Sequence, residues 1–223
     1  MKTGDLIERL TGELTPVRRI AGPAVRLTRW LLVSIPATCV VVWYFGPRPD
    51  LTTQLADGSF LAEEAAALLT ALFGVYAAFC AGHPDQPVWK MWLPLAPMML
   101  WIGELGQQCR EVLLRTGPGG LALTMDAMCV PAIALGGLVP AAAIVAMLRR
   151  GGHFRATHAC FCGALGAAAL SAAALRLYHA EDAAIMVIVW QLGSVVLFSL
   201  AAGAIGRMLV GVQHSGISRV TSG

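Results

Sequence analysis

The chain has 223 residues, of which 57% are hydrophobic and only 13% are charged, and its formal net charge is +3. Water-soluble domains carry about 25% charged residues. This composition therefore argues against a soluble enzyme, a disordered chain and a coiled coil. The apolar residues cluster in runs close to the roughly 20 residues that cross a bilayer as a helix. The sequence predicts one all-α, polytopic membrane domain.

The first 29 residues form a charged segment that differs from the rest. It contains six Lys or Arg residues, and no apolar core precedes position 27, so a cleavable signal peptide is not expected. We expect three parts: a cytoplasmic partner-binding segment over 1–29, a transmembrane domain over 30–206, and a cytoplasmic tail over 207–223.

A short amphipathic helix is predicted inside the N-terminal segment. Asp5 can cap it, and Pro16 ends it. Its apolar residues fall on one face: Leu6, Ile7, Leu10 and Leu14. Such a short helix is not stable in isolation, so it should order by docking on a membrane or on a partner. The mixed charge of the segment favours a protein partner.

Six apolar runs follow, each predicted to cross the membrane as a helix. They cover residues 27–45, 60–81, 89–105, 129–148, 158–177 and 183–205. A longer loop is predicted over 106–127. Small residues recur at four-residue spacing within the last two runs, as in Gly163, Ala167 and Ser171, and in Ser199 and Gly203. This spacing predicts close helix packing in lipid.

The distribution of Lys and Arg predicts the topology. Six spans place both termini on one side, and with that side in the cytoplasm twelve of the 16 basic residues fall in inner segments. The four others lie outside: Arg48, Arg110, Arg115 and Arg176. The positive-inside rule therefore predicts a multi-pass membrane protein with both termini in the cytoplasm.

The sequence carries little chemistry that would indicate an enzyme. It has no phosphate loop, no dinucleotide fingerprint and no paired His residues at metal-ligand spacing. Glu104 is the one acid that we place inside a span, and its position beside Gly106 indicates a hydrated helix terminus. We therefore expect neither catalysis nor a cofactor. A small membrane component of redox sensing or transport remains the alternative class.

The positions of the cysteines allow two interpretations of their role. Cys109 and Cys129 bracket the outer loop, and in an oxidising periplasm they could form a disulfide if their Cα atoms come within about 7 Å. The spacing alone favours the other reading, in which all six cysteines are small buried hydrophobes.

An ordered set of short motifs resembles a known family. The set comprises the opening MKTGDLIERL, Pro16-Val17-Arg18-Arg19, the Gly106-to-Cys109 stretch, Leu148-Arg149-Arg150-Gly151 and Tyr178-His179-Ala180-Glu181-Asp182. Together these motifs are similar to the NrsF family of six-span bacterial inner-membrane anti-sigma factors, which restrain an extracytoplasmic-function sigma factor.

The resemblance implies a role for each end of the protein. The N-terminal segment would hold the sigma factor away from core RNA polymerase, through the apolar face described above with Arg18 and Arg19 flanking it. The membrane part would release it on envelope, redox or metal stress. No direct contact with nucleic acid is implied.

One departure from the family concerns sensing. Cys129 keeps its counterpart, but His179 stands where the family has a second Cys. Cys109 or Cys39 would replace that Cys, His179 would assist metal binding with Cys129, or sensing would be lost; the sequence leaves these alternatives open.

Overall fold

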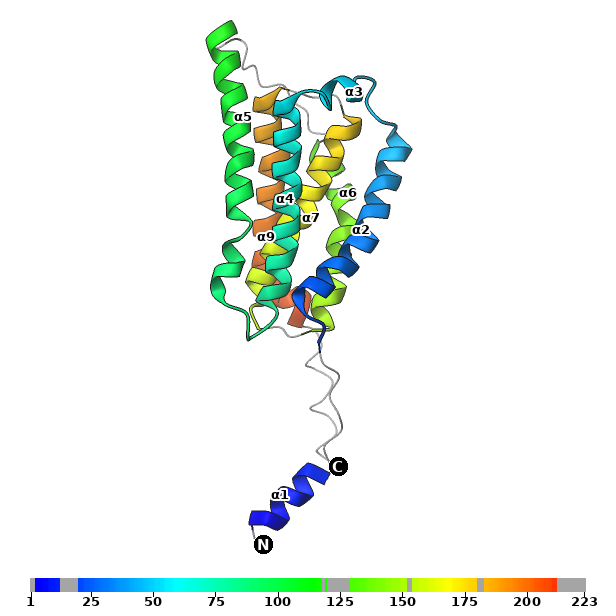
Figure 1. Ribbon diagram of the computed structural model, residues 1–223, viewed down its shortest axis with the longest axis vertical. Coiled ribbons are helices and arrows are strands. Elements are labelled where there is room, and N and C mark those ends of the chain that lie inside the picture. The colour runs from blue at the N-terminus through cyan, green and yellow to red at the C-terminus, as the bar shows by residue number, and fades with distance from the viewer. Residues whose placement is uncertain are drawn as a thin grey trace.

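The computed structural model describes residues 3–12, 20–117, 119, 129–151, 154–179 and 183–211, and the regular elements within them are all helical (Figure 1). The α-helices are α1 (Thr3–Gly12), α2 (Pro23–Phe45), α3 (Leu51–Gln54), α4 (Gly58–Ala81), α5 (Leu95–Thr116), α6 (Cys129–Arg149), α7 (Ala156–Tyr178), α8 (Ala184–Met186) and α9 (Gly193–Gly211). A 3₁₀ segment, η1 (Val88–Trp92), precedes α5, and a π-helical segment, η3 (Val187–Leu192), joins α8 to α9. The expectation of an all-α protein is confirmed.

The long helices run alternately up and down the bundle (Figure 1). α7 lies at the centre and packs extensively against α4, α6 and α9. The start of α2 and the end of α9 share one end, which we call the basic end because it carries Arg26, Arg29, Lys90, Arg149, Arg150, Arg155 and Arg207. The opposite end, called the distal end, carries Arg48, Arg110, Arg115 and Arg176.

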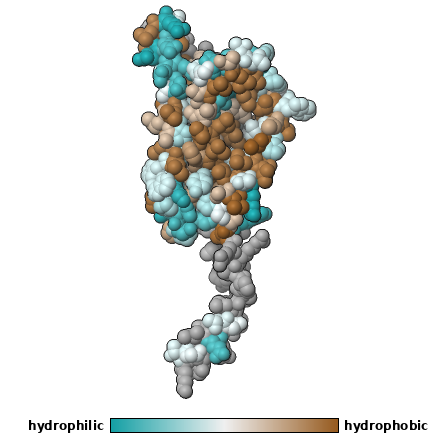
Figure 2. Space-filling model, in the orientation of Figure 1, coloured by the Kyte–Doolittle hydropathy of each residue, from teal (hydrophilic) through white to brown (hydrophobic). Residues whose placement is uncertain are grey.

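Five helices are long and apolar enough to cross a membrane. They are Pro23–Phe45, Gly58–Ala81, Cys129–Arg149, Ala156–Tyr178 and the continuous stretch Ala184–Val210. Figure 2 shows a hydrophobic band over the middle of the bundle, with hydrophilic side chains towards both ends. The expectation of a polytopic helical bundle is thus supported for five of the six predicted spans.

The third predicted span differs from its expected form. Residues 89–105 are not one helix, because Pro94, which lacks an N–H donor, separates η1 from α5. α5 then continues through Cys109 to Thr116, so the loop predicted over 106–127 is wrong for residues 106–116. Gly117, with a φ of 72°, ends the helix. The charged residues in its second half keep α5 outside the five apolar helices.

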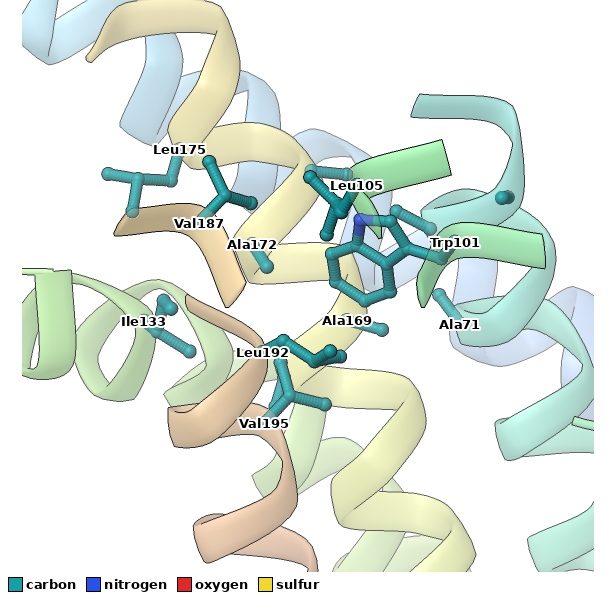
Figure 3. Close-up of a cluster of buried hydrophobic side chains, with 14 of the residues drawn as sticks. Ala71, Trp101, Leu105, Ile133, Ala169, Ala172, Leu175, Val187, Leu192 and Val195 are labelled. Atoms are coloured by element: carbon teal, nitrogen blue, oxygen red, sulfur yellow. The ribbon is translucent and has the colours of Figure 1, made fainter. Parts of the chain in front are cut away.

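A cluster of buried side chains in the distal half joins α4, α5, α6 and α7 to the continuous stretch α8–η3–α9 (Figure 3). Trp101 and Leu105 from α5 meet Ile133 from α6 and Val195 from α9 around the alanines of α7. The small side chains of α7 let its neighbours approach closely, so the large residues of the outer helices fill the remaining space.

Glycines permit the closest helix contacts. A Cβ atom on Gly166 of α7 would lie 2.7 Å from the Ala71 carbonyl oxygen and 2.9 Å from the Val75 backbone nitrogen of α4. Gly74 of α4 faces the same crossing, and a Cβ on it would lie 3.0 Å from the Gly166 nitrogen. The small residues predicted in the last two spans also lie at interfaces, since Gly163 meets Ile144 and Gly203 meets Phe161.

α2 is fastened to α6 near the basic end. Arg26 is 4% exposed, donates a hydrogen bond to the Met147 carbonyl oxygen in the last turn of α6, and stacks 4.6 Å from the Phe79 ring centroid. Trp30, fully buried, donates from Nε1 to the Pro140 carbonyl oxygen at 3.0 Å. A cation at the C-terminus of a helix is favoured by the helix dipole. The N-terminal segment is therefore joined to a firmly held helix.

A glycine substitution tests the α4–α7 crossing. Gly166→Ala forces a methyl group against the α4 backbone and should lower the free energy of unfolding by about 1–3 kcal/mol. Gly103→Ala in α5 is the matched control: nothing lies within 4 Å of its Cβ position, so it should be neutral or stabilise by up to about 1 kcal/mol. Thermal unfolding in detergent measures both, and equal effects would contradict the packing described.

Candidate functional site

A helix, α1, lies in the segment where the sequence predicts a partner-binding helix. It spans Thr3–Gly12, which contains Leu6, Ile7 and Leu10, and the Thr11 hydroxyl donates to the Glu8 carbonyl oxygen at 3.2 Å. The described helix includes Thr3 and Gly4, so Asp5 lies within it and the expected N-cap role of Asp5 is wrong. Leu14, Arg18 and Arg19 lie outside the described residues. The partner-binding role of all six residues stays a prediction.

The three candidate sensing residues lie at the distal end. Cys129 is the first residue of α6, only 3% exposed, and packs in the cluster of Figure 3. Cys109 is half-buried on α5 and packs against the same cluster. His179 is the C-cap residue of α7, and its backbone nitrogen donates to the Leu175 carbonyl oxygen at 2.8 Å. The fold thus brings all three to one end of the bundle.

None of the six cysteines is in a disulfide, so the Cys109–Cys129 bond that the sequence allowed is not formed. Four of them are buried, in keeping with the reading of cysteine as a small hydrophobe, whereas Cys109 is half-buried and Cys39 is exposed. No group of three metal-ligating side chains occurs among the described residues. Their sensing role remains a hypothesis.

A buried ionic cluster, which the sequence analysis missed, lies at the same end. Arg176 of α7 donates from Nη2 to Glu63 Oε2 at 3.1 Å, and its Nε lies 3.7 Å from Glu64 Oε1. Glu63 is 1% exposed and Arg176 is 4% exposed. Gln108 of α5 donates to Glu63 at 3.4 Å, and the Phe60 ring lies 5.2 Å from the guanidinium. Three helices therefore meet at one charged centre.

A second ion pair closes the turn after α2. Arg48 is 3% exposed and makes a bidentate pair with Asp50, with both distances at 2.7 Å. The Arg48 backbone nitrogen donates to the Leu177 carbonyl oxygen of α7 at 2.9 Å. The guanidinium lowers the pKa of Asp50 to about 2, so this carboxylate stays ionised at any physiological pH. The pair holds the α2–α3 turn over the end of α7.

The signal for the ionic cluster was in the sequence. Glu63 and Glu64 lie near the start of the second predicted span, and the sequence analysis uses Arg176 only to assign topology. Both acids lie more than one helical turn inside α4, and Arg176 lies two residues before the end of α7. Opposite charges set inside two apolar spans at the same membrane face predict an ion pair, because neither is stable alone in lipid.

Charge removal tests the cluster. Arg176→Gln leaves Glu63 buried without its cation, which costs about 3–5 kcal/mol and should lower the unfolding midpoint in detergent by roughly 6–20 °C. Arg115→Gln is the control, because the Arg115–Glu111 pair is exposed and such pairs contribute about 0–1 kcal/mol. Adding Glu63→Gln to Arg176→Gln should recover part of the loss. Similar midpoints for Arg176→Gln and Arg115→Gln would contradict this account.

The protein is a helical bundle, and at least five of its helices are long and apolar enough to span a membrane. This architecture is consistent with a multi-pass membrane protein. A family model described as NrsF, negative regulator of sigma F, matches residues 10–211. The chain therefore belongs to the NrsF family, whose name denotes a negative regulator of a sigma factor. No curated protein and no solved structure matches it.

Proposed function

We propose that this protein is a membrane anti-sigma factor that sequesters an extracytoplasmic-function sigma factor through residues 1–29 and releases it under envelope, redox or metal stress. The family match over residues 10–211 carries this proposal. The sigma factor is the partner, and the bundle is the anchor in a bacterial inner membrane.

The N-terminal segment is the part of the chain best suited to hold the partner. It forms a helix with Leu6, Ile7 and Leu10 at one-face spacing, and it precedes a membrane helix that is fastened at the basic end. The loops at that end are short: residues 82–87 precede η1, and residues 150–155 separate α6 from α7. A helix in a partner groove is a common recognition mode for such a segment.

A charge in the apolar face of α1 tests the contact. Burial of one Leu against a partner contributes about 1.5–3 kcal/mol, and a buried carboxylate adds a desolvation penalty. Leu10→Asp should therefore weaken binding of the sigma factor to the full-length protein in detergent at least about tenfold. In cells, sigma-dependent transcription should rise without stress while membrane insertion stays normal.

Thr11→Asp is the matched control, because Thr11 is exposed on the same helix and receives the same charge. It should bind within about twofold of the wild type, as surface substitutions usually do. A peptide of residues 1–29 should also bind. If neither this peptide nor the full-length protein binds the cognate sigma factor, the anti-sigma proposal is wrong; equal loss in both variants would exclude the Leu10 contact.

We further propose that η1 and α5 together make the sixth crossing, so that both termini are cytoplasmic. The chain direction reverses at each long helix, and the basic end carries most of the described Lys and Arg. Reporter fusions after Gly4 and after Gly223 should both read cytoplasmic. Five crossings would place the two reporters on opposite sides of the membrane. A periplasmic signal from either reporter would therefore contradict the proposed topology.

Cys129 is proposed to tune the response, alone or with Cys109 or His179, because the three lie at the end that this topology exposes to the periplasm. Cys129→Ser should blunt the transcriptional response to thiol-reactive metals and leave basal repression intact. Cys162→Ser is the control, since Cys162 is about as buried as Cys129 but lies in the half of α7 nearer the basic end. An unchanged response in Cys129→Ser would leave Cys129 with a packing role only.

A further inference from the structure

A pocket of about 530 Å³ separates η1 and the start of α5 from α7 and α9. Its wall is almost wholly apolar and includes Trp92, Leu95, Phe161, Leu165, Leu200 and Ala204. The pocket falls within the usual size range of ligand sites, about 300–1,000 Å³. Its lining contains no residue of the proposed sigma-factor contact or of the buried ionic cluster around Arg176.

The pocket opens on the side of the bundle that faces lipid. The side chains of Trp92, Leu95 and Leu200 at its edge are 61%, 46% and 58% exposed. Along α7 the lining residues run from Thr157 to Leu165, about 12 Å of helix starting at the basic end. The site therefore lies in one leaflet, between the interface and the middle of the bundle.

Water is a poor occupant for such a site. An ordered water needs two to four polar partners, and apolar cavities stay dry. Interiors rarely contain empty voids larger than a water molecule. A hydrocarbon chain is the apolar molecule that a bilayer supplies at this depth, and it would restore the missing contacts of the wall.

The mouth of the pocket at the basic end, in contrast to its apolar wall, carries polar side chains. Thr157 and His158 line it within the first turn of α7, which contains no acidic residue. Arg155, the N-cap residue of α7, is half-buried, makes no side-chain cap and lies beside the pocket rather than in its lining. Its guanidinium lies 5.2 Å from the Phe154 ring centroid, and its Nη1 has no hydrogen-bond partner among the described residues. Free N–H groups, the helix dipole and a guanidinium together favour an anionic oxygen group.

We propose that this pocket binds one glycerophospholipid of the leaflet at the basic end, with an acyl chain between α5, α7 and α9 and the phosphate at the N-terminus of α7. This inference goes beyond the proposed function and does not depend on it. The lipid would fill the gap that keeps the first turns of α5 away from α9.

Photolabelling of the full-length protein in liposomes tests the acyl-chain site. Phosphatidylglycerol with a diazirine in its acyl chain should label peptides of α5, α7 and α9 that line the pocket. Ala204→Phe fills the pocket from an exposed position and should reduce this labelling about tenfold, as exclusion of two buried methylenes predicts. Ala201→Phe, one turn earlier on α9 and also exposed, should leave labelling unchanged.

The phosphate is tested separately with a diazirine fatty acid that lacks glycerophosphate. Arg155→Gln should reduce labelling by phosphatidylglycerol and leave labelling by the fatty acid unchanged. Equal labelling of the Ala204→Phe and Ala201→Phe variants, or wild-type labels spread evenly over α2 and α6, would overturn the site. Labelling by phosphatidylglycerol that is insensitive to Arg155→Gln would overturn the assignment of a phospholipid held by its phosphate.

Discussion

The close approach of α4 to α7 at Gly74 and Gly166 is the contact on which the rest of the bundle depends. With no hydrophobic driving force between helices in lipid, packing and interhelical polar contacts must supply the association. The two glycines bring the backbones to a separation at which a single added methyl group collides with main-chain atoms. This places α7 at the centre, and the other helices pack around it.

The same crossing sets the register of the buried ionic cluster. α4 and α7 run in opposite directions, and Glu63 lies 11 residues before Gly74 while Arg176 lies 10 residues after Gly166. Both side chains are thus displaced towards the distal end by about 15–16 Å, which is why they meet at 3.1 Å. A buried ion pair contributes little net stability, but a slip by one helical turn would leave both charges unpaired. The pair therefore selects one alignment of the helices.

Hydropathy sufficed to predict the helical class, five of the spans and the small residues at the interfaces, because each depends on local composition. The break at Pro94 and the extension of α5 to Thr116 were not predicted. A hydropathy run marks where a chain is apolar and not where its helix ends, and α5 continues through charged residues that its neighbours and the interface accommodate. Of the candidate site, the helix around Leu6, Ile7 and Leu10 was foreseen, since helical spacing is local. The Glu63–Arg176 pair joins residues 113 apart in sequence: the charges inside two spans indicate that an ion pair forms, and the fold shows which side chains form it.

The proposed function relies on both ends of the protein, and α6 runs from one to the other. Its first residue is Cys129, packed at the distal end, and its last turn presents the Met147 carbonyl oxygen to Arg26, at the start of the helix that follows the N-terminal segment. This helix of 21 residues is about 30 Å long, and Pro140 lies inside it. Displacement of its distal end would reach α2 through the two hydrogen bonds that join the helices, from Arg26 to the Met147 carbonyl oxygen and from Trp30 to the Pro140 carbonyl oxygen. Release of a sigma factor by this route requires two discrete positions of α6 rather than a gradual loosening, because the packed small residues on either side of it do not deform continuously.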